Sequence, residues 1–256
     1  MAGALADPLA WMMTRAALAT MLCDPALGPR LRQQRVYEVL RPGQQPLGEM
    51  PTMPVMTFSA VAELRTALDG RQLPPGARAV LYDPEAWPFT PLAEQRDPVR
   101  GAEQAAELTR AHGLRLIVAP ALNLTTVLRP GGKGPRWQTF IDLGIAGSMA
   151  KVADAVELQA QSLERDTRGY ASFVAAAAAQ ARAAGPGVGL LAGLSTNPPG
   201  AAVTSQQLTA AIQASKQLVD GYWLNIPGRG LRCPTCNPPR PDIGADVLRQ
   251  ALGTTP

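Results

Sequence analysis

Two carboxylates, Asp83 and Glu85, flank a single proline directly after a short apolar run at residues 79–82. Residues two apart in an extended chain point to the same side, so both carboxyl groups are expected to share one environment. Like charges at close range raise one of the two pKa values, which gives a general acid beside an ionised base. The pattern therefore predicts the chemistry of glycosidic bond cleavage. The alternative is structural: Asp83 caps the Asp-Pro turn while Glu85 pairs with Arg96 or Arg100.

A third candidate catalytic carboxylate, Glu157, lies in a segment where apolar and polar residues alternate. Residues 155–161 read Ala-Val-Glu-Leu-Gln-Ala-Gln. As a strand, this segment places Glu157, Gln159 and Gln161 on one face and Val156, Leu158 and Ala160 on the other. Such a polar row suits the interior of a closed barrel near its upper layers. The alternative is an edge strand of an open sheet with its polar side in water.

Amide and indole side chains lie at or near the carboxyl ends of the predicted strands. The expected substrate-binding residues are Trp87, Asn123, Gln159, Gln161, Asn197, Trp223 and Asn225. Amides can form paired hydrogen bonds with sugar hydroxyls, and indole faces can stack on sugar rings. The same amides could instead satisfy backbone groups of long loops.

A glycine-rich basic segment, residues 129–136, offers a second kind of chemistry. Lys133 and Arg136 could hold an anion such as a phosphate, a diphosphate or an acidic sugar. That interpretation gives an alternative function, a transferase, lyase or cyclase that acts on a phosphorylated substrate. The spacing does not match a GxxxxGK[ST] phosphate-binding loop, and no aspartate-rich magnesium motif accompanies it. A surface loop or lid is the other interpretation.

The histidine and cysteine content limits the remaining chemistry. His112 is the single histidine, which excludes histidine triads and multi-histidine metal sites. No metal and no organic cofactor is implied. Cys233 and Cys236 form a CxxC pair, for which we expect a loop-bracing disulfide or two idle thiols. Redox activity is the weaker alternative, because Asn-Pro-Pro follows the pair where a helix would be required.

Composition and charge exclude several classes of partner. The chain has 256 residues, with 24 Lys and Arg against 20 Asp and Glu. The basic residues are scattered and form no stripe with stacking aromatics, so we expect no nucleic acid partner. No apolar run is long enough for a membrane span. Residues 8–22 are interpreted as an amphipathic helix rather than a signal peptide, because Asp7 precedes them and Arg15 interrupts them. We therefore expect a cytoplasmic protein, with secretion not excluded and the oligomeric state open.

The chain alternates apolar runs with helical stretches from residue 53 onward. Strands are expected at residues 36–40, 54–58, 79–82, 114–119, 155–161, 188–194 and 221–226. Helices are expected at residues 60–68, 98–111, 139–152, 167–184, 204–218 and 243–252. This alternation is typical of a mainly parallel sheet with crossover helices. An eighth strand is not evident.

Loop lengths indicate which end of the sheet carries the site. Connections from helix to strand are short, whereas residues 83–97, 120–138, 195–203 and 227–242 form long connections from strand to helix. Long loops at the carboxyl ends of parallel strands carry function. We favour a single α/β domain over residues 1–256, a (β/α)8 TIM-type barrel, irregular or incomplete in its N-terminal part at residues 1–50. An open doubly wound sheet is the alternative.

The Asp-x-Glu motif at Asp83 and Glu85, with tryptophans nearby, resembles glycoside hydrolases of the (β/α)8 type. In chitinase-like families the motif is the longer DxxDxDxE, and here Arg78 and Leu81 replace its first two aspartates. The resemblance implies that Glu85 is the catalytic acid and base and that Asp83 orients it or stabilises charge. A glycoside-hydrolase-like enzyme acting on a small molecule or oligosaccharide is thus the favoured function. A barrel that only binds carbohydrate or a partner protein is the third possibility.

Overall fold

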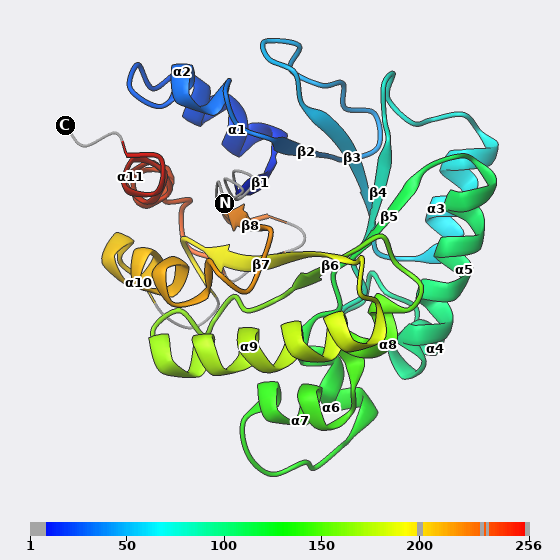
Figure 1. Ribbon diagram of the computed structural model, residues 1–256. Helices are drawn as coiled ribbons and strands as arrows, with labels where there is room; N and C mark the ends of the chain where they lie inside the picture. The colour runs from blue at the N-terminus through cyan, green and yellow to red at the C-terminus, as the bar shows by residue number, and fades with distance from the viewer. Residues whose placement is uncertain (1–8, 199–201, 231–232, 234–235, 254–256) are drawn as a thin grey trace, which may run out of the picture.

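Eight parallel strands close into a barrel in the computed structural model, which describes residues 9–198, 202–230, 233 and 236–253 (Figure 1). The strands follow one another around the barrel in chain order, and the last strand pairs with the first. Their bounds are β1 Ala10–Thr14, β2 Val36–Leu40, β3 Met53–Phe58, β4 Ala79–Tyr82, β5 Arg115–Val118, β6 Ala155–Leu158, β7 Gly189–Ser195 and β8 Gly221–Asn225. The expected (β/α)8 barrel is confirmed, and the open sheet is not formed.

Helices surround the barrel as crossover connections, as Figure 1 shows. Those before β6 are α1 Arg15–Leu22, α2 Gly28–Leu31, α3 Val61–Asp69, α4 Leu92–Arg96, α5 Pro98–Ala111, α6 Thr125–Leu128, α7 Arg136–Asp142 and α8 Ile145–Ala150, with the short 3-10 turn η1 at Leu122–Leu124. Those after β6 are α9 Thr167–Ala184, α10 Ser205–Ser215 and α11 Pro241–Ala251. No helix of the described chain is both long and apolar enough to cross a membrane.

The N-terminal part supplies the eighth strand, where one long helix was expected. The prediction of a helix over residues 8–22 was wrong: Ala10–Thr14 forms β1, and α1 begins only at Arg15. Residue 8 itself lies outside the described residues. Thr14 caps α1, because its hydroxyl accepts a hydrogen bond from the backbone N–H of Ala17 at 3.3 Å. With β1 and β2 in place, the barrel is complete.

A glycine divides the helix expected at residues 139–152. The structure has two helices there, α7 and α8, and Gly144 between them adopts a φ of 66°. Glycine tolerates this left-handed conformation without the steric cost that a side chain brings. The prediction of one continuous helix was therefore wrong.

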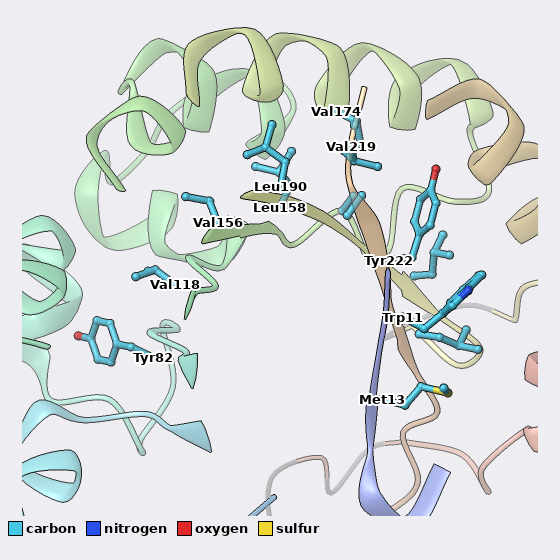
Figure 2. Close-up of a cluster of buried hydrophobic side chains, with 14 of the residues drawn as sticks. Trp11, Met13, Tyr82, Val118, Val156, Leu158, Val174, Leu190, Val219 and Tyr222 are labelled. Atoms are coloured by element: carbon cyan, nitrogen blue, oxygen red, sulfur yellow. The ribbon is translucent and has the colours of Figure 1, made fainter. Parts of the chain in front are cut away.

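Strand side chains alternate between an outer and an inner apolar layer. The outer side chains pack against the helices, and Figure 2 shows Val156, Leu158 and Leu190 in this layer, near Val174 of α9. The inner layer fills the barrel axis and includes Met12, Val39, Val55, Leu81, Ile117, Leu191 and Trp223. Val156, Leu158 and Ala160 all lie in the outer layer, so the predicted alternation is confirmed, although β6 itself ends at Leu158.

Candidate functional site at the carboxyl ends of the strands

Asp83 follows β4 directly and is almost fully buried at the carboxyl end of the barrel. Its backbone N–H donates to the carbonyl of Phe58 at 2.9 Å, which continues the pairing with β3. Its Oδ1 accepts a hydrogen bond of 2.7 Å from Nε2 of Gln159. The same Nε2 donates to the carbonyl of Ala119 at 3.1 Å. Gln159 therefore connects the ends of three strands and fixes the position of the Asp83 carboxylate.

Glu85 lies two residues further along and is half-buried. Its Oε2 accepts a hydrogen bond of 3.2 Å from Nδ2 of Asn123, in the loop after β5. The Oδ1 of Asn123 in turn accepts the backbone N–H of Ala86 at 2.8 Å. Asn123 thus holds both the side chain of Glu85 and the backbone beside it. The predicted binding residue Asn123 is a neighbour of the predicted acid.

The end of β4 is anchored from outside the barrel by Tyr82. Its hydroxyl donates to Oε2 of Glu94 at 2.7 Å, and burial raises the pKa of this phenol far above its ordinary range. A Cβ on Gly101 would lie 2.4 Å from that hydroxyl oxygen, so the ring needs a glycine opposite it. Glu94 also accepts the backbone N–H of Val61. This outer anchor holds the strand end from which Asp83 projects inward.

Glu157 is fully buried inside the barrel. Among the described residues neither of its carboxyl oxygens has a hydrogen-bond partner. Burial raises its pKa well above the ordinary value, and the charges of Asp83 and Glu85 raise it further. The neutral acid is therefore the favoured form. The three predicted carboxyl groups belong to one electrostatic cluster, with Glu157 as its buried member.

Trp87 lies in a turn that hydrogen bonds hold in place beside Glu85. The hydroxyl of Thr90 accepts the backbone N–H of Glu85 at 3.1 Å and the indole N–H of Trp87 at 2.9 Å. Gln95 donates to the backbone carbonyls of Trp87 and Thr90. The Trp87 ring meets Phe89 edge to face, with 5.1 Å between centroids. A half-buried indole is thereby held, through Thr90, to the backbone of Glu85.

Two other predicted binding residues lie inside the barrel wall. Trp223 is 7% exposed and packs in the inner layer, and its indole N–H has no partner among the described residues. The amide of Gln161 lies over Gly193, since a Cβ at that glycine would come within 2.6 Å of three amide atoms. The amide of Gln161 fits there because Gly193 has no side chain. Trp223 is thus a buried wall residue rather than an open stacking surface.

Asn197 and Asn225 contribute to the loops that surround the site. Nδ2 of Asn197 donates to the carbonyls of Pro227 at 3.4 Å and Asn237 at 3.0 Å. The carbonyl of Asn225 accepts the backbone N–H of Thr196 at 3.0 Å. The Asn197 contacts are the loop-supporting role expected as the alternative to substrate binding, whereas the Asn225 contact uses its backbone and continues the pairing of β7 with β8. A direct role for either residue in binding stays a prediction.

Glu164, in the long loop after β6, was not among the principal candidates, yet its carboxylate accepts two backbone hydrogen bonds. It is fully buried and accepts the backbone N–H groups of Ser162 at 2.6 Å and Ser195 at 2.7 Å. Burial raises its pKa to about 7. Ser162 adopts a φ of 85°, an unusual conformation for a residue with a side chain. Nothing local in the sequence marks Glu164, because its main partner, Ser195, is 31 residues away.

The basic segment at residues 129–136 differs from the carboxylate cluster in charge and in exposure to solvent. Lys133 and Arg136 are exposed, and Arg136 begins α7. Arg129 forms an ion pair with Asp142 at 3.7 Å. Neither Lys133 nor Arg136 lines the cavity between α1 and the loop after β8 or the cavity at the amino ends of the strands. Anion binding by this segment stays a prediction.

Cys233 and Cys236 are joined in a disulfide with a Cα–Cα distance of 5.3 Å. Of the expected alternatives, a loop-bracing disulfide or two idle thiols, the disulfide is formed.

The described residues contain no group of three or more His, Cys, Asp or Glu side chains arranged to hold a metal ion.

Comparisons with known proteins identify the fold and leave the family open. No family model and no curated protein sequence matches this chain. A chitinase from Chromobacterium violaceum has a TM-score of 0.52 at 11% identity, covering 96% of this chain and 100% of that chain. A sugar phosphate isomerase/epimerase from Parabacteroides distasonis has a TM-score of 0.52 at 8% identity, covering 99% and 96%. Pyruvate carboxylase from Rhizobium etli has a TM-score of 0.51 at 11% identity, covering 97% and 28%. This chain has the TIM-barrel fold. Such distant likeness shows that fold and no specific activity.

Proposed function

We propose that the carboxyl end of this barrel hydrolyses a glycosidic bond, with Glu85 as the acid and base. The observation that supports this proposal most strongly is the arrangement of two carboxylates at the end of β4. Asp83 and Glu85 each accept a hydrogen bond from an amide that follows another strand, Gln159 after β6 for Asp83 and Asn123 after β5 for Glu85. Two carboxyl groups held at fixed positions beside a half-buried indole are what cleavage of a glycosidic bond requires.

The proposed roles follow from the environments of the carboxyl groups. Glu85 gives its proton to the oxygen of the leaving sugar as the bond to the anomeric carbon breaks. It then takes a proton from water, whose hydroxyl adds to the anomeric carbon, so that the acid form of Glu85 is restored. Asp83, held by Gln159, stabilises the positive charge that develops on the sugar ring. Glu157, neutral and buried, adds no further negative charge beneath Asp83.

The test is turnover of a panel of chromogenic glycosides and oligosaccharides by the wild type and by Glu85→Gln. The expected loss is about 10²-fold or more, because the amide cannot transfer the proton. Glu107→Gln is the matched control, since Glu107 is exposed on α5. Equal turnover of any glycoside by the wild type and Glu85→Gln would overturn the proposal, and so would turnover of none.

A second panel of phosphorylated metabolites distinguishes the alternative function. Binding or turnover of these compounds that Lys133→Ala abolishes would favour the transferase, lyase or cyclase interpretation instead. Binding of oligosaccharides without any turnover would favour a barrel that only binds carbohydrate.

A further inference from the structure

The amino end of the barrel contains a cavity of about 580 Å³. It is lined by seven of the eight strands and by the residues just before β8, so it lies on the barrel axis opposite the carboxylate cluster. Its inner wall includes Ile117 and Leu191 of the inner apolar layer. We refer to it as the floor cavity. Its volume is in the range of small-molecule sites.

Small side chains in the lowest inward-facing positions create this space. The cavity is lined there by Ala10, Ala79, Ala155 and Gly189. Register places Ala155 beside Gly189 on the adjacent strand, so two neighbouring strands lack bulk at the same level. Branched residues usually fill such layers in this fold. The inward-facing positions at this level therefore contribute small apolar side chains to the cavity wall.

Four cations surround the opening of the floor cavity and come from four separate parts of the chain. They are Arg35 before β2, Arg115 at the start of β5, Arg182 in α9 and Lys216 after α10. Arg182 pairs with Asp220 at 3.6 Å. The described residues give Arg35, Arg115 and Lys216 no ion pair and no side-chain hydrogen bond. Basic residues near the C-terminus of a helix commonly interact favourably with the helix dipole. Arg35 and Arg115 belong to no helix, so this explanation does not apply to them.

The two acidic residues of the lining are already occupied by backbone groups. Asp154 Oδ2 accepts the N–H of Leu116 at 2.8 Å, and Asp220 Oδ2 accepts the N–H of Leu190 at 2.7 Å. These bonds hold the amino ends of adjacent strands together. Four cations against two acids leave a surplus of two positive charges around the opening. An apolar hollow with a cationic opening suits a ligand with an apolar body and an anionic head.

We propose that the floor cavity binds a small organic oxyanion, with its carboxylate or phosphate at Arg35, Arg115 and Lys216 and its apolar body between Ala79, Ala155 and Leu191. The site is independent of the carboxylate cluster at the opposite end. Because carboxylates and phosphates share the same recognition by guanidinium and ammonium groups, the test includes both.

The experiment is isothermal titration of the full chain with benzoate, phenyl phosphate, inorganic phosphate and benzyl alcohol at low salt. Benzoate or phenyl phosphate is expected to bind with a Kd of about 1 mM or lower, more tightly than inorganic phosphate, while neutral benzyl alcohol binds more weakly. The double variant Arg115→Ala/Lys216→Ala is expected to weaken binding of the organic anion roughly tenfold or more. Both side chains are exposed, so the variant is expected to fold.

Arg65→Ala/Arg168→Ala removes the same charge from exposed positions outside the cavity and is the matched control. Ala155→Leu fills the hollow without changing its charge and is expected to reduce binding of phenyl phosphate but not of inorganic phosphate. The proposal is overturned if neither organic anion binds. It is also overturned if the two double variants weaken binding equally.

Discussion

The two ends of this barrel surround the same axis with side chains of opposite charge. At the carboxyl end, Asp83, Glu85 and Glu157 form one electrostatic cluster. At the amino end, Arg35, Arg115 and Lys216 surround the opening of the floor cavity. The inner apolar layer, with Met12, Val55 and Leu81, lies between the two sets. Because the strands run parallel, residues before the strands gather at one end of the barrel and residues after them gather at the other, so one scaffold presents two different chemistries.

Removal of the charge of Asp83 tests the carboxyl end with the largest expected effect. Asp83→Asn keeps an oxygen that can accept from Gln159, so the local structure is expected to persist. Turnover of a glycoside is expected to fall about 10²- to 10³-fold, since the developing positive charge loses its counter-charge. Steady-state kinetics measure this loss of turnover, and a thermal melt of each protein is the control for correct folding. A loss below about threefold would assign the carboxylate a structural role.

Glu164 connects the carboxyl end of the barrel to the pH dependence of the free energy of unfolding. Its folded pKa of about 7 lies above its ordinary value of 4.5. The stability contributed by the neutral form is thus fully present below pH 4.5 and is lost as the pH rises to about 7, roughly 3 kcal/mol in all. Glu164→Gln should lack this dependence. Urea unfolding of both proteins between pH 5 and 8 measures it, and a constant difference between them would contradict it.

Gln159→Leu tests whether the amide positions Asp83. The change removes the hydrogen bonds to Asp83 and to the carbonyl of Ala119. We expect kcat to fall roughly tenfold with little change in KM, because the carboxylate loses its orientation while substrate contacts remain. Gln159→Glu would add a negative charge and should also alter the pH dependence of kcat. A rise in KM alone would instead make Gln159 a direct binding residue.

Glu157→Gln is expected to have the smallest effect. Because burial keeps the carboxyl neutral, the amide preserves both shape and charge, and the free energy of unfolding at pH 7 should change by about 1 kcal/mol or less. Chemical denaturation measures it, with Glu107→Gln on the surface as the reference. A loss above about 3 kcal/mol would show that Glu157 is ionised and partnered in the folded protein.

Periodicity predicted much of the barrel, and it failed where short apolar runs were ambiguous. Residues 36–40 and 79–82 form the predicted strands, and residues 98–111 and 167–184 form the predicted helices. The run at Ala10–Thr14 is too short for its period to separate strand from helix. Thr14 was the available signal, because a threonine before a helical stretch is a typical N-cap.

The candidate site was predicted in part because strand direction places strand ends together. The position of Asp83, and the inward face of residues 155–161, follow from alternation alone. The partners of Glu164 and Asn197 could not be predicted, since their contacts join residues about 30 or more positions apart. The floor cavity was missed for the same reason: its cations come from four elements, and no local motif connects them.

Both assays, applied to variants at both ends of the barrel, test directly whether the two sites are independent. Glu85→Gln and Arg115→Ala/Lys216→Ala are each measured for glycoside turnover and for binding of phenyl phosphate. Two independent sites predict a crossed result: Glu85→Gln loses turnover and keeps binding, while the double variant loses binding and keeps turnover. Loss of both properties in either variant would contradict two independent sites, and so would loss of neither.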